Sequence, residues 1–382
     1  MGLGTKIRDD PVTCLRKTQA ESSVLFFAPT RLQAAARRFV AGFPGLVTYA
    51  VKANPSEEVI LNLAAAGVKA FDVASVPEIA MVRRLVPDAA LHFNNPVRTR
   101  AEIDAAIRLG VVSFSVDSMS ELDKLIAARP APGTEVSVRF KLPVAGAIYD
   151  FGAKFGLPAD AAAPVLARVA AAGLVPSLTF HPGTQCTEPG AWAAYIRAAA
   201  AIAVTAGVRI ARLNVGGGFP SHRNAAVVPE LAAMFIAIAT ETVEAFGDAP
   251  PALLCEPGRA LVGDAFALAV RVRAVRDGAH VFLNDGIYGG LAEAALLGAP
   301  DRIVALAPDG TRRTGNRVER IVFGPTCDSV DRLPGMIGLP DDLAEGDWVV
   351  FQGMGAYCAV TATRFNGFGA IEEATVLALE AA

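Results

Sequence analysis

The stretch LVTYAVKANP, residues 46–55, opens with β-branched and aromatic residues and reaches a lysine, Lys52, just before an Asn-Pro pair. Its first half is typical of a buried strand, and the Asn-Pro pair favours a turn that ends the strand. Lys52 would therefore lie at the mouth of a hydrophobic core, where an ammonium group is costly to desolvate. Two interpretations stay open from this stretch alone: Lys52 reaches water or pairs with a carboxylate, or it has a chemical role.

Similar β-type runs recur along the first two thirds of the chain, and helix-like segments separate them. The first five runs begin at residues 46, 69, 90, 112 and 135, in steps of 23, 21, 22 and 23 residues. The predicted strands are 46–51, 69–73, 90–94, 112–116, 135–141, 176–180, 211–215 and 252–256, and the predicted helices include 57–66, 77–85, 100–109, 118–128, 191–206 and 229–246. Eight strand–helix units predict an α/β fold with a parallel sheet, most simply closed as a (β/α)8 barrel. An open doubly wound sheet is the alternative, although no early GxGxxG turn supports it.

After Arg259 the pattern changes to β-rich segments joined by Gly, Pro and Asp loops. These segments are 265–275, 280–284, 320–324, 347–352 and 357–362. They predict a second, mainly antiparallel β domain. We therefore expect a barrel over residues 26–264 and a β-sandwich-like or β-barrel-like domain formed by residues 1–25 and 265–382.

Composition limits the classes of protein. The chain has 382 residues, 53% of them hydrophobic and 19% charged, which favours two well-buried domains over disorder. The net charge is 35 − 38 = −3 and no Lys/Arg-rich run occurs, so we expect neither nucleic acid nor a membrane as partner. The charged start lacks the apolar core of a signal peptide, and no apolar run is long enough to span a bilayer. Five cysteines without CxxC spacing indicate free thiols, no structural zinc and a cytoplasmic location.

Chemically distinct side chains follow the predicted strands. In (β/α)8 barrels, functional residues gather at the carboxyl ends of the strands. The residues found there are Lys52, Asp72, Glu78, Arg139, His181, Gly216, Gly217, Gly218, Glu256 and Arg259. A lysine, a histidine, three glycines and a glutamate on one rim predict a functional site there.

Each of these groups has a possible use and a structural alternative. The glycines of NVGGGFP, residues 214–220, would let backbone amides approach an anion closely, or they serve a turn that needs positive φ. Arg259 could hold the same anion, a phosphate, with its charged fork, although alone it would be a surface arginine. Glu256 follows apolar residues and needs a cationic partner, which Lys52 itself could supply. His181 could stack on a flat ring or act as a base, although a loop histidine alone more often does neither.

A phosphate site, a deep carboxylate, a flat imidazole and a lysine together predict a pyridoxal phosphate pocket. The lysine amine would form a Schiff base with the cofactor aldehyde. The carboxylate would pair with the ring nitrogen and keep it protonated. The ring would then accept the electrons of a carbanion at the α-carbon of an amino acid.

Seven motifs carry a family resemblance: YAVKANP, FDVASVPEI, HPGTQC, NVGGGFP, EPGR, GPTCDSVD and GAYCAVTATRFNGF. They run in order from about residue 46 to 369, and together they are highly specific. The chain resembles the ornithine and diaminopimelate decarboxylases, fold-type III pyridoxal phosphate enzymes with an alanine-racemase-like barrel and a C-terminal β domain. It is most similar to the bacterial ornithine and lysine/ornithine decarboxylases of polyamine biosynthesis.

The resemblance implies a role for each matching residue. Lys52 would be the Schiff-base lysine, and Glu256 would bind the ring nitrogen. Asp72 and Glu78 would line the cofactor side of the pocket, and His181 would stack on the ring. The phosphate would be held by Thr184, Gly217, Gly218, Arg259 and Tyr357.

The resemblance also implies how the substrate is handled. Cys327 would reprotonate the α-carbon after carbon dioxide leaves, and Asp328 with Tyr288 would bind the substrate's distal amine. In the family, the counterparts of Cys327 and Asp328 reach the site from a partner subunit, which implies a homodimer with two shared sites. Without the motif, Cys327 would be read as a buried free cysteine with no chemistry.

Two segments depart from the family pattern. Leu296 and Leu297 stand where the family usually has a Tyr-Asp pair, and Glu293 is the nearest acid. The segment PVAGAIYDFGAKFG, residues 143–156, also differs from its family counterpart. We expect decarboxylation of a basic L-amino acid, ornithine or lysine, to putrescine or cadaverine. The alternatives are diaminopimelate, arginine or a modified amino acid. A racemase and an inactive regulatory homologue are disfavoured, the first by Glu256 and the second by the retained Lys52 and Cys327.

Overall fold

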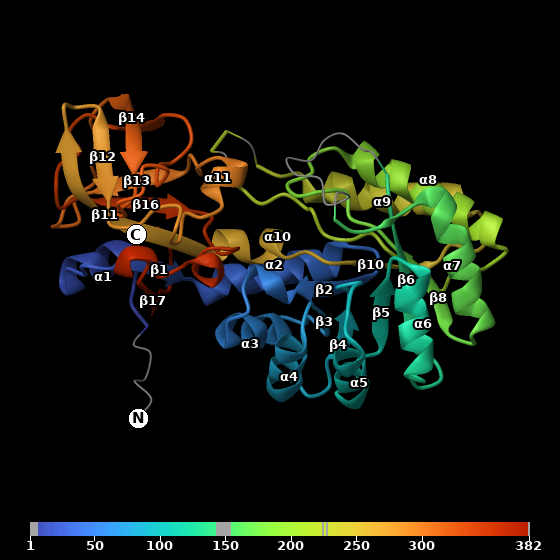
Figure 1. Ribbon diagram of the computed structural model, residues 1–382. Helices are drawn as coiled ribbons and strands as arrows, with labels where there is room; N and C mark the ends of the chain where they lie inside the picture. Colours follow the sequence, from blue (N-terminus) through green and yellow to red (C-terminus); the bar gives the residue numbers. More distant parts are fainter. Residues whose placement is uncertain (1–6, 143–153, 224, 227, 381–382) are drawn as a thin grey trace. The chain divides into compact units, whose positions relative to one another are not determined.

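The computed structural model describes residues 7–142, 154–223, 225–226 and 228–380 (Figure 1). The chain divides into two compact units. The barrel unit comprises Ala36–Pro220 and Pro229–Gly258, and the β unit comprises Met1–Ala35, Ser221–Val228 and Arg259–Ala382. Most of the altered segment 143–156 lies outside the described residues.

The barrel unit contains eight parallel strands that close on themselves. They are β2 (Leu46–Ala50), β3 (Ala70–Val73), β4 (Ala90–Phe93), β5 (Ser113–Val116), β6 (Glu135–Lys141), β8 (Val175–Thr179), β9 (Arg212–Asn214) and β10 (Ala252–Cys255). Each strand pairs in parallel with the next, and β10 pairs with β2. The barrel prediction is confirmed, and the open-sheet alternative is wrong. A two-residue strand, β7 (Leu157–Pro158), adds to the edge of β6.

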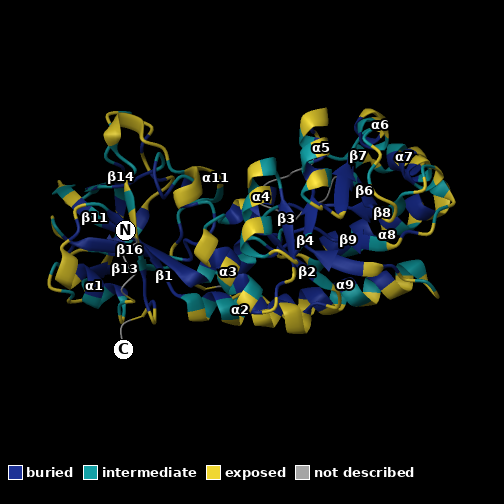
Figure 2. Ribbon diagram, turned by 90° about the horizontal axis from the view of Figure 1, so that it is seen from below, coloured by how far each residue is buried: buried dark blue, intermediate teal, exposed yellow. Residues whose placement is uncertain are grey.

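Helices follow the strands and turn their apolar sides inward, so the strands are buried and the outer helix faces are exposed (Figure 2). They are α3 (Glu57–Ala65), α4 (Val76–Leu85), α5 (Arg100–Arg108), α6 (Met119–Ala127), α7 (Ala159–Ala171), α8 (Pro189–Ala206) and α9 (Leu231–Phe246). Side-chain caps start several of them: Ser75 accepts the Glu78 N–H, and Thr99 forms a capping box with Glu102. None of the helices in the described ranges is both long and apolar enough to cross a membrane.

The β unit is built around a mostly antiparallel sheet. Its strands are β1 (Ser23–Phe27), β11 (Phe266–Arg276), β12 (His280–Leu283), β13 (Ile303–Leu306), β14 (Arg317–Phe323), β15 (Ile337–Pro340), β16 (Trp348–Gln352) and β17 (Ile371–Thr375). The order is β13-β16-β11-β12-β14-β15, and β1 pairs with both β11 and β17. Two pairs, β12 with β14 and β1 with β17, are parallel. The predicted mainly antiparallel domain is confirmed.

One predicted strand of the β unit is wrong. Residues 357–362 form no strand but contain a short 3-10 turn, Ala359–Thr361. Tyr357 has a φ of 52°, which no strand residue adopts, and it turns the chain immediately after a glycine-rich loop. Only Cys358 of this segment is buried, so its apolar composition does not indicate a strand in the core.

Candidate active site

A cavity of about 290 Å³ lies in the barrel unit, at the carboxyl ends of the strands. Nearly every strand contributes to its wall: Lys52 after β2, Asp72 in β3, Asn94 after β4, Ser115 in β5, Arg139 in β6, Thr179 in β8, His181 just after β8 and Glu256 after β10. Five of the predicted rim residues are thus brought together. A larger hollow of about 490 Å³ in the β unit contains none of the predicted site residues in its lining.

Lys52 stands in a single 3-10 turn, Val51–Ala53, directly after β2. Val51 and Ala53 are fully buried, whereas Lys52 between them is exposed and lines the cavity. The hydroxyl of Tyr49 donates to the Asn54 carbonyl over 2.8 Å, which fastens the end of this turn. The local sequence therefore directs the lysine amine away from the core and into the cavity.

Two buried carboxylates share the cavity with this lysine. Asp72 is 6% exposed and Glu256 is 9% exposed. Burial and, second, the neighbouring Glu256 raise the pKa of Asp72 well above its usual range, and the Lys52 ammonium opposes this shift. Burial also raises the pKa of Glu78, although the Ala74 N–H, 2.7 Å from its carboxylate, and Lys52 oppose the rise.

Glu256 is held by two asparagine amides that the sequence did not reveal. The Asn94 amide donates to Glu256 Oε1 over 2.5 Å, and the Asn214 amide donates to the same oxygen. The strand-end rule that identified Glu256 applies equally to both asparagines, which follow β4 and end β9. Neither was singled out because an amide carries no distinctive chemistry of its own.

His181 presents a neutral imidazole. Its Nδ1 accepts a hydrogen bond from the Gly183 N–H over 3.0 Å. Burial first, and then the positive charges of Lys52 and Arg139, hold its pKa well below the usual range. Arg139 is half-buried, and this burial lowers its pKa while Glu256 opposes the shift. A neutral ring whose Nδ1 is already engaged is suited to stacking against a flat ligand.

The glycine loop after β9 packs tightly against its neighbours. Gly216 and Gly218 have φ values of 70° and 83°, so the turn interpretation is correct for these two positions. Gly217 has no positive φ, but a Cβ there would lie 2.7 Å from the Glu256 carbonyl oxygen and 3.2 Å from His181 Nε2. The half-buried Thr184 lies in the adjoining loop. The N–H of Cys186, in the same loop, donates to the Gly218 carbonyl over 2.9 Å and ties this loop to the glycine loop.

These observations fit pyridoxal phosphate. The cavity has a lysine for the aldehyde, a buried carboxylate for the ring nitrogen and a neutral imidazole beside it. At Gly217, the absence of a side chain keeps open the space between the imidazole and the backbone after β10. The donor set matches the three parts of the cofactor: aldehyde, ring and phosphate.

Two further predicted phosphate residues, Arg259 and Tyr357, meet in the β unit. The Arg259 guanidinium lies 5.1 Å from the centre of the Tyr357 ring and forms a two-pronged ion pair with Glu293. Arg223 is 3.9 Å from the same carboxylate, and burial together with Arg259 lowers its pKa to about 10. Glu293, the acid nearest to Leu296 and Leu297, therefore forms ion pairs with two arginines, Arg223 and Arg259.

The three predicted substrate residues also meet in the β unit. The Tyr288 hydroxyl donates to Asp328 Oδ2 over 2.6 Å, and this bond lowers the pKa of Asp328. Cys327 is exposed, so its interpretation as a buried cysteine is wrong. Its N–H donates to Asn366 Oδ1 over 3.1 Å. Asn366, which the sequence did not single out, has a φ of 52°.

The altered helix α11 (Ala294–Leu297) presents no carboxylate, and the side chain of Leu296 is exposed.

Comparison with known proteins agrees with this chemistry. Residues 30–263 match the family model described as the pyridoxal-binding domain of pyridoxal-dependent decarboxylases. The lysine/ornithine decarboxylase of Selenomonas ruminantium is 33% identical over 330 residues, covering 84% of this chain and 81% of that protein. The ornithine decarboxylase of Panagrellus redivivus is 32% identical over 342 residues, covering 84% and 77% of the two chains.

Solved structures give the same result. The arginine decarboxylase of Paramecium bursaria Chlorella virus, bound to agmatine, has a TM-score of 0.84 at 26% identity and covers 95% of this chain and 98% of that one. The lysine/ornithine decarboxylase of Vibrio vulnificus, complexed with cadaverine, has a TM-score of 0.80 at 27% identity, covering 97% of both chains. The chain therefore belongs to the pyridoxal-dependent decarboxylases and is a pyridoxal phosphate-dependent amino-acid decarboxylase.

Proposed function

We propose that the protein removes the α-carboxylate of L-ornithine or L-lysine to give putrescine or cadaverine and carbon dioxide. The observation that carries this proposal is the buried Glu256 carboxylate in the same cavity as Lys52. A carboxylate at the ring nitrogen keeps the ring protonated, and a protonated ring is the strong electron acceptor that decarboxylation needs. The two similar enzymes named for lysine and ornithine support the choice of a basic substrate.

The cavity residues have separate tasks in this proposal. When bound, the cofactor supplies the acceptor for the electron pair of the broken bond. Lys52 would hold the aldehyde carbon through Nζ, and Glu256 would hold the proton at the ring nitrogen. The neutral His181 would cover one face of the ring. Thr184, Gly217, Gly218, Arg259 and Tyr357 would hold the phosphate.

Substrate handling falls to residues of the β unit. The Cys327 thiol would deliver a proton to the α-carbon after carbon dioxide leaves. Asp328, whose lowered pKa keeps it ionised at neutral pH, would bind the cationic distal end together with Tyr288. We propose that Cys327 and Asp328 act on the site of a second copy of the chain, so that the protein works as a homodimer.

A second candidate is arginine, diaminopimelate or a modified amino acid. The absence of a carboxylate on α11 motivates it, because the distal ammonium of ornithine or lysine would have no acidic partner on this helix. The structural similarity to the viral arginine decarboxylase points the same way.

The test is to incubate the cofactor-loaded protein with ornithine, lysine, arginine, meso-diaminopimelate and the D-forms. Carbon dioxide and amine products are measured for each. Rapid release from ornithine or lysine is the expected result. Release only from arginine or diaminopimelate would replace the substrate, and no release from any of them would contradict the proposed substrate class.

A further inference from the structure

The cavity wall contains a hydrogen-bonded chain that the motifs do not mark. Ser115 is fully buried in β5, and Asn94 is buried after β4. The Ser115 hydroxyl donates to Asn94 Oδ1 over 2.9 Å, and the Asn94 amide donates to Glu256 Oε1 over 2.5 Å. The chain thus runs from a strand hydroxyl, through one amide, to the carboxylate expected at the ring nitrogen.

This arrangement admits only one orientation of the Asn94 amide. Turned by 180°, the amide would aim its oxygen at a carboxylate and lose the acceptor that the serine uses. The Asn94 amide also acts on Asp72, where it opposes the burial and the Glu256 charge that raise the pKa of that carboxyl. Asn94 therefore influences both buried carboxylates of the cavity.

Both amides that reach Glu256 bind the same oxygen. Asn94 and Asn214 donate to Oε1, which leaves Oε2 as the oxygen that a ring N–H can address. The two amide donors fix the carboxylate in place on its Oε1 side. Oε2 is then the oxygen that can accept a hydrogen bond from a protonated ring nitrogen.

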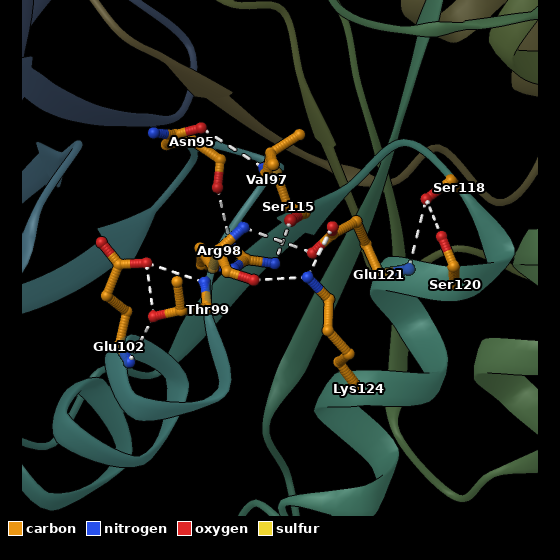
Figure 3. Close-up of polar contacts among 10 residues, drawn as sticks. All are labelled: Asn95, Val97, Arg98, Thr99, Glu102, Ser115, Ser118, Ser120, Glu121 and Lys124. Atoms are coloured by element: carbon orange, nitrogen blue, oxygen red, sulfur yellow. Dashed lines mark hydrogen bonds and ion pairs between the residues drawn. The ribbon is translucent and has the colours of Figure 1, made fainter.

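A buried arginine, Arg98, holds the backbone beside this hydrogen-bonded chain, and Figure 3 shows its contacts with Asn95 and Ser115. Arg98, 3% exposed, donates through Nη1 to the carbonyls of Phe93 and Asn95 over 3.0 and 2.9 Å. These residues flank Asn94. Through Nη2, Arg98 donates to the Ser115 carbonyl over 2.6 Å. One guanidinium thus fixes both partners of the Ser115–Asn94 bond.

The charge of Arg98 is supported locally. Its guanidinium lies 5.1 and 5.4 Å from the ring centres of Phe93 and Phe114. Burial lowers the Arg98 pKa to about 10, against the attraction of Glu121, so the group stays charged at neutral pH. Glu121 also accepts the Arg98 N–H over 3.3 Å and pairs with Lys124 over 2.6 Å.

We propose that Asn94, oriented by Ser115, is a positioning residue that directs the free oxygen of Glu256 to the ring nitrogen and so keeps the proton on the cofactor ring. The proposal rests on the role of Glu256 proposed above. It predicts that loss of the amide, or of the hydroxyl that orients it, moves the proton from the ring nitrogen toward the carboxylate. A merely structural role for Asn94 would leave that proton where it is.

The experiment uses the holoenzyme loaded with cofactor labelled with ¹⁵N in the ring, because the ¹⁵N chemical shift reports protonation directly. Asn94→Ala should shift the signal toward the unprotonated range, and Ser115→Ala should shift it in the same direction by less. Ser115→Thr keeps the hydroxyl and should restore the wild-type signal. Asn95→Ala is the matched control, because Asn95 lines the same cavity and its side chain, within the described part of the chain, bonds to backbone groups: the Ala74 carbonyl and the Val97 N–H.

A wild-type signal in both Asn94→Ala and Ser115→Ala would overturn the proposal. If Asn94→Ala does not fold, Ser115→Ala decides alone, and an unshifted signal there overturns it. Glu256→Gln is the reference variant for a ring nitrogen that has lost its carboxylate partner. If its signal equals that of the wild type, the proposed role of Glu256 fails and this inference fails with it.

Discussion

Lys52 shows how a local sequence can aim one side chain. Its two neighbours are fully buried, so the turn that carries them can present only the lysine to the cavity. Because the lysine side chain is exposed, its removal leaves no void in the core. Substitutions at this position therefore test chemistry without a large effect on folding.

Lys52→Ala should abolish turnover and covalent attachment of the cofactor while the protein stays folded. Reduction with borohydride followed by peptide mass spectrometry locates the attached cofactor. Lys154→Ala is the matched control, because Lys154 lines the same cavity. Its peptide map should still show the cofactor on the peptide that contains Lys52, and attachment anywhere else would refute the assignment.

Gly217→Ala should weaken cofactor binding through a steric effect. The added methyl group would press on the Glu256 carbonyl and the His181 ring, an overpacking that costs about 1–3 kcal/mol. Cofactor dissociation followed by absorbance, together with thermal unfolding, measures both effects. Gly190→Ala is the control, since a Cβ there meets open space at the start of α8. Equal cofactor affinity in the two variants would contradict the prediction.

Asn366 offers a way to separate the position of Cys327 from its chemistry. Its left-handed backbone suits glycine and asparagine, so Asn366→Gly keeps the turn but removes the acceptor of the Cys327 N–H. Asn366→Asp keeps the acceptor. We expect Cys327→Ala to lower kcat by about 10²–10⁴-fold, as loss of an acid usually does. Asn366→Gly should lower it by less, and Asn366→Asp should stay near the wild-type value. Steady-state kinetics checks the order, and an unchanged kcat in Cys327→Ala would exclude the thiol as the acid.

At the scale of elements, the strands were predictable because parallel strands buried on both faces are continuous apolar runs. The helix α7 was not predicted as an element, since Pro164 lies inside it and proline usually ends a helix. Short strands such as β13 and β15 carry only four residues each and were also missed. The wrong strand at 357–362 has a backbone cause, the positive φ of Tyr357, which composition does not reveal.

The strand β4 gives the barrel a measurable sensitivity to acid. His92 in this strand is buried, and burial together with Arg212 in β9 lowers its pKa to about 3 from 6.5. Between these values the unfolded chain binds a proton at His92 and the folded chain does not. The contribution of His92 to the free energy of unfolding is therefore fully present above pH 6.5. It is lost as the pH falls below this value, by at most about 1.4 kcal/mol per pH unit.

We expect His92→Gln to show a shallower loss of stability between pH 6.5 and 4 than the wild type. Urea unfolding at several pH values gives the free energy of unfolding and hence the slope. The substitution can also change the overall stability, but only the slope reports the histidine. Parallel slopes in the two proteins would show that His92 is not the responsible group.

At the scale of the whole molecule, the proposed homodimer can be tested by mixing two inactive variants. If Lys52 and Cys327 of one site come from different copies, a mixed dimer of Lys52→Ala and Cys327→Ala chains keeps one intact site of two. Random exchange makes half of the dimers mixed, so about a quarter of the wild-type activity should return. If both residues of a site belong to the same chain, mixing restores nothing.

The predictable part of the site has a physical reason. Lys52, Asp72, His181 and Glu256 were accessible to sequence reasoning because each stands at a strand end and carries distinctive chemistry. Asn94, Ser115 and Arg98 acquire their roles only when β4 and β5 lie side by side, and that pairing joins residues 21 apart in the sequence. A single sequence does not show which polar residues meet across two strands.

The pairing of β1 with β17 has a consequence for biosynthesis. Ser23 pairs with Ile371, so 371 − 23 = 348 residues separate the two partners. At roughly 5–20 residues per second, a ribosome needs tens of seconds to pass from one strand to the other. The strand β1, made almost entirely of apolar residues, waits for β11 at one edge and through the whole interval for β17 at the other, while the barrel strands emerge. Newly made chains should therefore depend on chaperones for β1 in particular, and stalled chains that end before β17 should aggregate.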